Sequence, residues 1–346
     1  MEKLKVERDT MSRRVQSQEE QIRQVQALAF KDIGSDSWTA GDDGTVRADL
    51  ENLHGRLKSW AKKHAIQDMG EISKLAPEEY QMLIRCLAEI VRLGPGMSFS
   101  TVEHLLQPPM NRKSPAMCIQ GLLAHHVYSW IISQPFFAFG NRADLLQEII
   151  GHIQQVDQNE SHILRSRILR LLAAAPRPSV GQGDSTNDRY GEFQKAVCRK
   201  HAEWFYGSPV RHLIKPAGAA DGDAAAQCFT ELQSIMQSAG ELSHKLWSRR
   251  TTLRVLTLRD FEGVRFGKGL EHMRAHPLHR LYEDDDRCND WLVNMVTHPA
   301  VLGFGSGDGK DYETPRVWIK AEVWLAEEAA NEAADRAADQ AARGGA

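Results

Sequence analysis

A stretch of the chain between Lys113 and Arg142 contains no aspartate, glutamate, lysine or arginine. A membrane-spanning helix needs roughly 20 mostly apolar residues. Here the apolar run is interrupted by glutamine, histidine, serine and proline, whose polar groups are costly to place in lipid. Helices that are apolar all round also occur in the cores of large soluble proteins. We therefore expect one buried helix from Ser114-Pro115 to Pro135, and no membrane as a partner.

Apolar residues recur at spacings of three and four through most of the chain up to Trp247, which is the pattern of amphipathic helices. The resulting fold class is mainly α, with a multi-helix, bundle-like body over 45–215 that continues through 216–325. Loops are expected over 176–187 and 217–223, where glycine, proline and small polar residues gather. The other predicted helices span 45–65, Pro77 to Gly94, a short segment after the capping box of 100–103, 141–157, 161–175, 188–206 and 223–248.

Beyond Trp247 the pattern changes, and a small β element is expected near 251–258 and 316–325. The second run alternates, with Val317, Ile319, Ala321 and Val323 on one face and Trp318, Lys320, Glu322 and Trp324 on the other. A period of two over that length predicts a strand. We expect the two strands to pair, helices to fill 260–298 between them, and the alanine-rich tail 326–346 to be helical or disordered.

The first residues carry a heptad whose a and d positions are mostly apolar, with Arg8 and Gln18 as interruptions. A seam of period 3.5 favours a partner helix. We therefore expect a coiled-coil-like helix over 1–31, followed by a linker over 32–44. The alternative to coiled-coil pairing is an amphipathic helix that folds back on the body of the same chain. The residues expected to contact a partner protein or a second copy, through 1–29, are Met11, Val15, Ile22 and Val25.

Three histidines form the most metal-like group: His272, His276 and His279. If a helix covers His272 and His276, their spacing of four places both imidazoles on one face, as in paired zinc ligands. One aspartate of 284–286 could add an oxygen ligand. The alternative is a helix end at the surface, where histidines suit the negative end of the helix dipole. A metalloprotease motif would need glutamate directly after His272, but Met273 stands there and Glu271 precedes the histidine. We therefore expect no cofactor, and zinc is the ion to test.

A glycine-rich run over 303–310 resembles a phosphate-binding loop but departs from it in detail. Phe304 stands where the P-loop needs its first glycine, and Asp311 follows Lys310 where a hydroxyl is needed. The dinucleotide fingerprint fails as well, because Asp308 occupies the position of its third glycine. We interpret the run as a turn-rich connection, and the sequence leaves open whether it binds an anion.

Charge and cysteine content restrict the remaining classes. Lysine and arginine number 43 against 46 aspartates and glutamates, a formal net charge of −3, which is not the basic excess of a dedicated nucleic-acid binder. Five well-separated cysteines form no CxxC pair and argue against a disulfide framework or a cysteine-rich zinc module. The charged N-terminus lacks the features of a secretory signal. We expect an intracellular protein, cytoplasmic or nuclear, with no nucleic-acid partner.

Several short segments resemble uncharacterised, mostly helical proteins that are common in filamentous fungi. The segments that carry the resemblance are Trp38, Trp60-Ala61, Leu246-Trp247, Arg259-Asp260-Phe261, His298-Pro299-Ala300-Val301, the run to Tyr312, and Val317-Trp318-Ile319-Lys320-Ala321. The resemblance extends over most of 38–325. It implies a helical intracellular protein and assigns no activity to any residue.

Three functions follow from these patterns, in order of preference. The first is a non-enzymatic interaction or scaffold protein, because the apolar residues serve helix-to-helix contacts and no catalytic residues are singled out. The second is a metal-dependent or small-molecule enzyme with a site at His272 and His276. The third is a nucleic-acid-associated regulator, against which the net charge speaks.

Overall fold

The structure is a computed structural model that describes residues 43–94, 97–98, 103, 105–173, 189–216, 222–282, 285–306 and 310–326. The description concerns the compact unit to which the described residues belong, 42–346. Several predictions lie wholly or mostly outside the described residues. They are the heptad helix 1–31 with Met11, Val15, Ile22 and Val25, the linker 32–44, the loops at 176–187 and 217–223, and the tail 326–346. After the predicted capping box of 100–103, the described residues 105–113 form turns and the short η4 (Met110–Arg112).

The described residues are mainly α-helical, as the sequence predicts. Their long helices begin and end close to the predicted positions, except that α3 stops at Leu87, well before Gly94. Short helical turns connect several of them. The α-helices are α2 (Asp43–His64), α3 (Pro77–Leu87), α4 (Ser114–Val127), α5 (Ala143–Val156), α6 (Gln158–Ala173), α7 (Arg189–Gly207) and α8 (Gly222–Trp247).

The predicted apolar helix is α4, which is buried almost throughout its length. It continues into a π-helical turn, η5 (Tyr128–Ile132), and ends just before Pro135. Trp130 corrects the expectation of complete burial, because its side chain is 58% exposed. Among the helices of the described ranges, none combines the length and the unbroken apolar character that crossing a bilayer would require.

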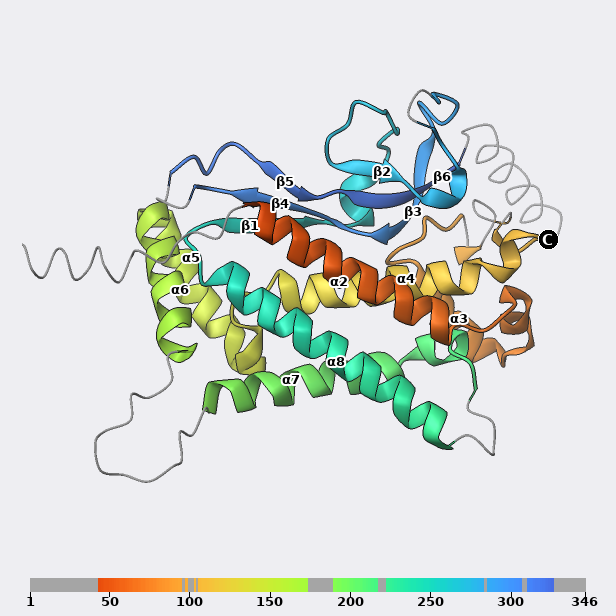
Figure 1. The fold of residues 1–346 in the computed structure, drawn as a ribbon, viewed down its shortest axis with the longest axis horizontal. Helices are drawn as coiled ribbons and strands as arrows, with labels where there is room; N and C mark the ends of the chain where they lie inside the picture. Colours follow the sequence, from red (N-terminus) through yellow and green to blue (C-terminus); the bar gives the residue numbers. More distant parts are fainter. Residues whose placement is uncertain are drawn as a thin grey trace, which may run out of the picture. The chain divides into compact units, whose positions relative to one another are not determined.

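Six strands follow α8 and form two three-stranded sheets with orders β1-β4-β5 and β2-β6-β3. All neighbours are antiparallel except β2 and β6, which run parallel. The strands lie along one side of α2 and α4, and α7 and α8 lie on the other side of that helix pair (Figure 1). The strands are β1 (Thr252–Leu256), β2 (Met273–Ala275), β3 (Leu292–His298), β4 (Ala300–Phe304), β5 (Arg316–Ile319) and β6 (Ala321–Ala326).

Three predictions about this region are wrong. The range 260–298 contains strands β2 and β3 and short turns, with no α-helix among its described residues. The strands near 251–258 and 316–325 do not pair, because β4 lies between β1 and β5. The run 316–325 is two strands, β5 and β6, which belong to different sheets and meet at the exposed Lys320. Consequently three residues of the second face, Trp318, Glu322 and Trp324, are buried.

One hydrophobic core joins the helices to both sheets. It includes Leu50 of α2, Leu123 of α4, Met236 of α8, Met295 of β3 and Trp324 of β6. Helix and sheet lie close together at Gly121 of α4, where an added Cβ would lie 3.0 Å from a backbone oxygen of β3 and 2.7 Å from the side chain of Ile90. Glycine therefore permits α4 to lie directly on the sheet.

The hairpin β4–β5 gives a first testable prediction, at Gly303. The indole of Trp318 covers this glycine, so that an added Cβ would stand 2.2 Å from the ring. We expect Gly303→Ala to destabilise the protein by about 2–3 kcal/mol, because the ring must leave its place in the core. Gly55→Ala is the matched control, since its Cβ would meet nothing within 4 Å on the exposed side of α2. It should stabilise by about 0.5–1 kcal/mol, and urea unfolding measures both changes. Equal effects of the two substitutions would contradict the packing argument.

Candidate functional site

The three predicted metal ligands lie on separate short elements and face different partners. His272 stacks on the ring of Phe261. His276 follows strand β2 and is buried, with its Nε2 3.5 Å from Oε1 of Glu322. His279 stacks on Trp324, and its Nε2 accepts a hydrogen bond from the backbone N–H of Leu325. The expectation that His272 and His276 share a helix face is wrong, because the chain is extended there.

The aspartates near these histidines are engaged elsewhere. Asp285 pairs with Arg287, and Asp286 lies 3.6 Å from Nζ of Lys268. Among the described residues no group of three or more histidine, cysteine, aspartate or glutamate side chains is arranged to hold a metal ion. The zinc site at His272, His276 and His279 therefore stays a prediction that the geometry does not support.

The sequence analysis missed a buried polar cluster centred on Glu322 of strand β6, here called the Glu322 cluster. Its carboxylate is 1% exposed and receives hydrogen bonds from Gln120 of α4, at 3.2 Å, and Thr297 of β3, at 3.1 Å. Nζ of Lys58 lies 3.5 Å from Oε1, and Nε2 of His54 lies 3.6 Å from Oε2. The ring of His54 also meets that of His298, whose Nε2 contacts the hydroxyl of Tyr128 at 3.0 Å. Its members are His54, Lys58, Gln120, Tyr128, Arg274, His276, Thr297, His298 and Glu322.

The electrostatics of the Glu322 cluster keep one negative charge inside the protein. Burial raises the pKa of Glu322, but its hydrogen bond with His54 and the nearby side chains of His276 and Lys58 lower that pKa by more than burial raises it, so the net shift is downward. Burial lowers the pKa of His276 to about 4 and that of His298 well below its usual value. A paired charge of this kind ties α2, α4, β2, β3 and β6 together. Because its centre is almost fully covered, it is a structural element of the core.

A second feature, here called the aromatic groove, lies between the α4–η5 segment and α7. Three of its side chains are exposed although they are large and apolar: Trp130 at 58%, Phe193 at 61% and Trp204 at 62%. The groove consists of two adjoining hollows of about 770 and 940 Å³, which share Trp130, Gln134 and Trp204. Concave sites of this size with mostly apolar walls and a few polar groups are typical of ligand and peptide sites.

The π-helical turn explains why Trp130 faces outward. Ser133 donates its backbone N–H to the carbonyl of Tyr128, a bond that spans five residues instead of four. The wider turn keeps Tyr128, Ile131 and Ile132 in the core and leaves Trp130 at the surface. Such π-turns are frequently found at functional sites.

Two hydrogen-bonded histidines form the floor of the groove. Nε2 of His126 lies 3.1 Å from Nδ1 of His201, and the indole of Trp204 stands edge-on to His201. Burial lowers the pKa of His126 to about 3 and that of His201 to about 4. Both rings are therefore neutral near pH 7, and one imidazole N–H donates to the other ring.

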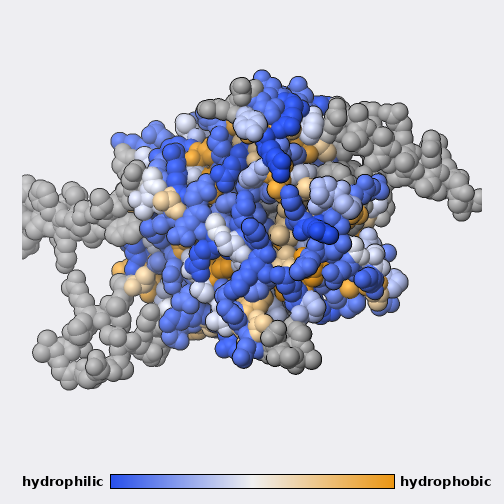
Figure 2. All heavy atoms as spheres, turned by 45° about the vertical axis from the view of Figure 1, so that its right-hand side comes forward, coloured by the Kyte–Doolittle hydropathy of each residue, from blue (hydrophilic) through white to orange (hydrophobic). Residues whose placement is uncertain are grey.

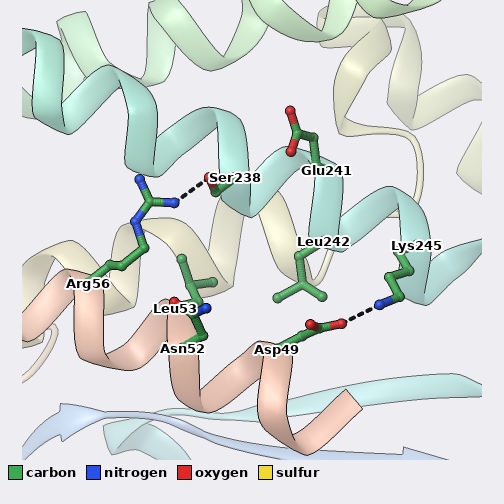
Figure 3. A pocket seen from close by; sticks show the side chains of 8 residues that line it. All are labelled: Asp49, Asn52, Leu53, Arg56, Ser238, Glu241, Leu242 and Lys245. Carbon is green, nitrogen blue, oxygen red and sulfur yellow. Dashed lines mark hydrogen bonds and ion pairs between the residues drawn. The ribbon is translucent and has the colours of Figure 1, made fainter. Parts of the chain in front are cut away.

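A smaller hollow between α2 and α8 differs from the aromatic groove in its chemistry. Figure 3 shows Arg56 reaching Ser238 and Lys245 reaching Asp49 across the two helices. Arg56 also donates to Ser234 at 3.0 Å. These contacts fasten α2 to α8. On the face drawn in Figure 2, hydrophilic residues dominate and hydrophobic ones occupy small areas between them.

Comparison with protein-family models, with curated proteins and with solved structures finds no match to this chain. The resemblance to helical fungal proteins therefore stays a prediction, and the function is argued from the geometry alone.

Proposed function

We propose that this protein is a non-enzymatic interaction protein that binds another protein through the aromatic groove. The observation that carries the proposal is the exposure of Trp130, Phe193 and Trp204 around one continuous hollow. Aromatic side chains, and tryptophan above all, dominate the binding energy of protein interfaces. Leaving three of them in water is unfavourable unless a partner covers them.

The position of the groove on rigid elements supports the same function. Trp130 is fixed by the buried α4–η5 segment, and Phe193 and Trp204 lie on α7, whose inner face packs on α8. A preformed surface loses little conformational freedom on binding, which favours affinity. The heptad of 1–29, with Met11, Val15, Ile22 and Val25, is proposed as a second contact for a partner or another copy.

Site-specific photo-cross-linking in cells gives the second prediction. A photoreactive residue in place of Phe193 should cross-link to a discrete partner, because the position borders the groove. The same residue in place of Tyr282, which is 77% exposed outside the groove, is the matched control and should not. The identified partner, once purified, should bind Trp204→Ala about 30-fold more weakly than the unchanged protein, as expected for an aromatic anchor.

The proposal fails if the two positions cross-link alike, or if the purified partner binds Trp204→Ala as well as it binds the unchanged protein. Leu171→Ala serves as the control substitution for affinity, because that side chain is 69% exposed and does not line the groove. Thermal unfolding of each variant separates a loss of binding from a loss of folding.

A further inference from the structure

Several hydrogen-bond donors that line the aromatic groove have no partner among the described residues. The indole N–H groups of Trp130 and Trp204 make no hydrogen bond to any described residue, and neither does the side-chain amide of Gln134. Arg142 and Lys200, which line the same hollow, form no ion pair within the described ranges. Indole, guanidinium and ammonium groups can donate but cannot accept. A ligand that covers these indole and cationic groups must therefore supply acceptors and apolar surface together.

The backbone chemistry of the possible occupants decides between them. An α-helix uses its own N–H and C=O groups internally, so it would cover the indole N–H groups without satisfying them. An ordinary extended strand offers as many N–H groups as carbonyls, and those of its N–H groups that meet the indoles would lie opposite other donors. Proline has no N–H, and a polyproline II segment presents free carbonyls beside apolar rings. Segments of this kind characteristically bind in grooves lined with aromatic residues.

The charges along the groove add a second requirement. In the hollow that contains Phe193, two cations, Arg142 and Lys200, face one anion, Asp144. The Glu89–Arg259 pair of the adjoining hollow is neutral overall, with 3.2 Å between its charged groups. The imidazoles of His126 and His201 are uncharged near neutral pH for the reason given above. An acidic residue at one end of the bound segment therefore complements the groove.

We infer that the aromatic groove binds an extended, proline-rich protein segment flanked by acidic residues. This inference rests on the proposed function and specifies its partner. The proline rings pack on Trp130, Phe193 and Trp204, the carbonyls accept hydrogen bonds from the indoles and Gln134, and the acidic flank meets Arg142 and Lys200.

Fluorine NMR of the full chain labelled with 5-fluorotryptophan tests the inference directly. The chain has 8 tryptophans, and the signals of two of them are assigned with Trp130→Phe and Trp204→Phe. The probe is a synthetic peptide with two glutamates followed by eight prolines. Its controls are a peptide of equal charge in which glycine and serine replace the prolines, and an amphipathic helical peptide with the same two glutamates. We expect the proline peptide to shift the two assigned signals, and the controls to leave them in place.

Variants sharpen the same experiment. Trp130→Ala should weaken binding of the proline peptide about 30-fold, whereas Leu171→Ala should leave it unchanged. Reversing the charges with Arg142→Glu and Lys200→Glu should weaken binding of the acidic peptide several-fold and spare a peptide that lacks the glutamates.

The outcomes separate this inference from the function on which it rests. If the helical or the glycine-serine peptide shifts the two signals as strongly as the proline peptide, the proline-rich partner is wrong. If the proline peptide shifts neither signal while Phe193 still cross-links a partner that Trp204→Ala releases, the inference fails and the proposed function stands. If no peptide binds and Phe193 cross-links nothing, both fail.

Discussion

Replacing Arg165 with methionine should destabilise the protein by about 4 kcal/mol, a large part of the total stability of a domain. Arg165 of α6 is 3% exposed and lies 4.8 Å from the centre of the Trp247 ring. Its guanidinium donates hydrogen bonds to the backbone carbonyls of Trp247, Arg249, Arg250 and Thr251, at the end of α8 and the turn into β1. Methionine fills much of the volume but removes the guanidinium hydrogen bonds to these mostly buried carbonyls, of which that of Arg250 also accepts a bond from the hydroxyl of Tyr312.

Arg167→Met is the matched control, because it makes the same chemical change two residues along α6 on an exposed side chain. Its effect should stay within about 0.5 kcal/mol. Arg165→Lys should recover only part of the loss, since one ammonium group cannot reach carbonyls arranged for a planar fork. Chemical unfolding measures all three free energies. If Arg165→Met and Arg167→Met behave alike, the guanidinium does not hold the end of α8.

The helical half of the fold could be predicted because the signals that specify a helix come from residues that are close together in the sequence. Amphipathic spacing and first-turn residues such as Pro77 and Pro115 locate helix starts well, and α2, α4 and α8 begin close to their predicted positions. The strands β2 and β3 were missed for a physical reason. Strand β3 is buried at every position and therefore shows no alternation of polar and apolar residues. Strand β2 is only three residues long, which is too short to show an alternating pattern. It forms by pairing in parallel with β6, a segment far away in the sequence.

Both sites depend on tertiary contacts that no local pattern encodes. Glu322 stands in an alternating run whose ordinary interpretation is a strand with one solvent-exposed face, yet α2 and α4 cover Glu322. Two weak signals were present, a glutamate in an otherwise apolar strand and His54 within the apolar stripe of α2. Trp130 is exposed because a π-helical turn rotates it out of an otherwise buried helix. No pattern in the sequence indicates this π-helical turn.

Lowering the pH should unfold this protein cooperatively, with a midpoint near about pH 5. Burial lowers the pKa values of His162, His201 and His276 to about 4, that of His126 to about 3, and that of His298 well below its usual value. In the unfolded chain these histidines titrate near about 6.5. As the pH falls below that value, the unfolded state binds protons that the folded state does not bind. The free energy of unfolding therefore decreases until the pH reaches the pKa values of the folded state.

The size of the effect follows from the number of protons. About four protons taken up on unfolding correspond to a loss of roughly 5 kcal/mol per pH unit, which exhausts the stability of an ordinary domain within one to two units. Glu322 acts in the same direction but later. Its folded pKa is depressed, so its stabilisation is complete above the unfolded value of about 4.3 and is lost only as the pH falls below it. The histidines, and not the carboxylate, should therefore set the midpoint.

Urea unfolding at several pH values between about 7.5 and 5 gives the proton uptake as the slope of the unfolding free energy against pH. His201→Gln should reduce the uptake by about one proton, because it removes one buried imidazole with a lowered pKa. His152→Gln is the matched control, since that side chain is 70% exposed, and it should leave the slope unchanged. An uptake below about two protons in the unchanged protein would show that the buried imidazoles accept charge without unfolding, and that the core around Glu322 and His201 is open to water.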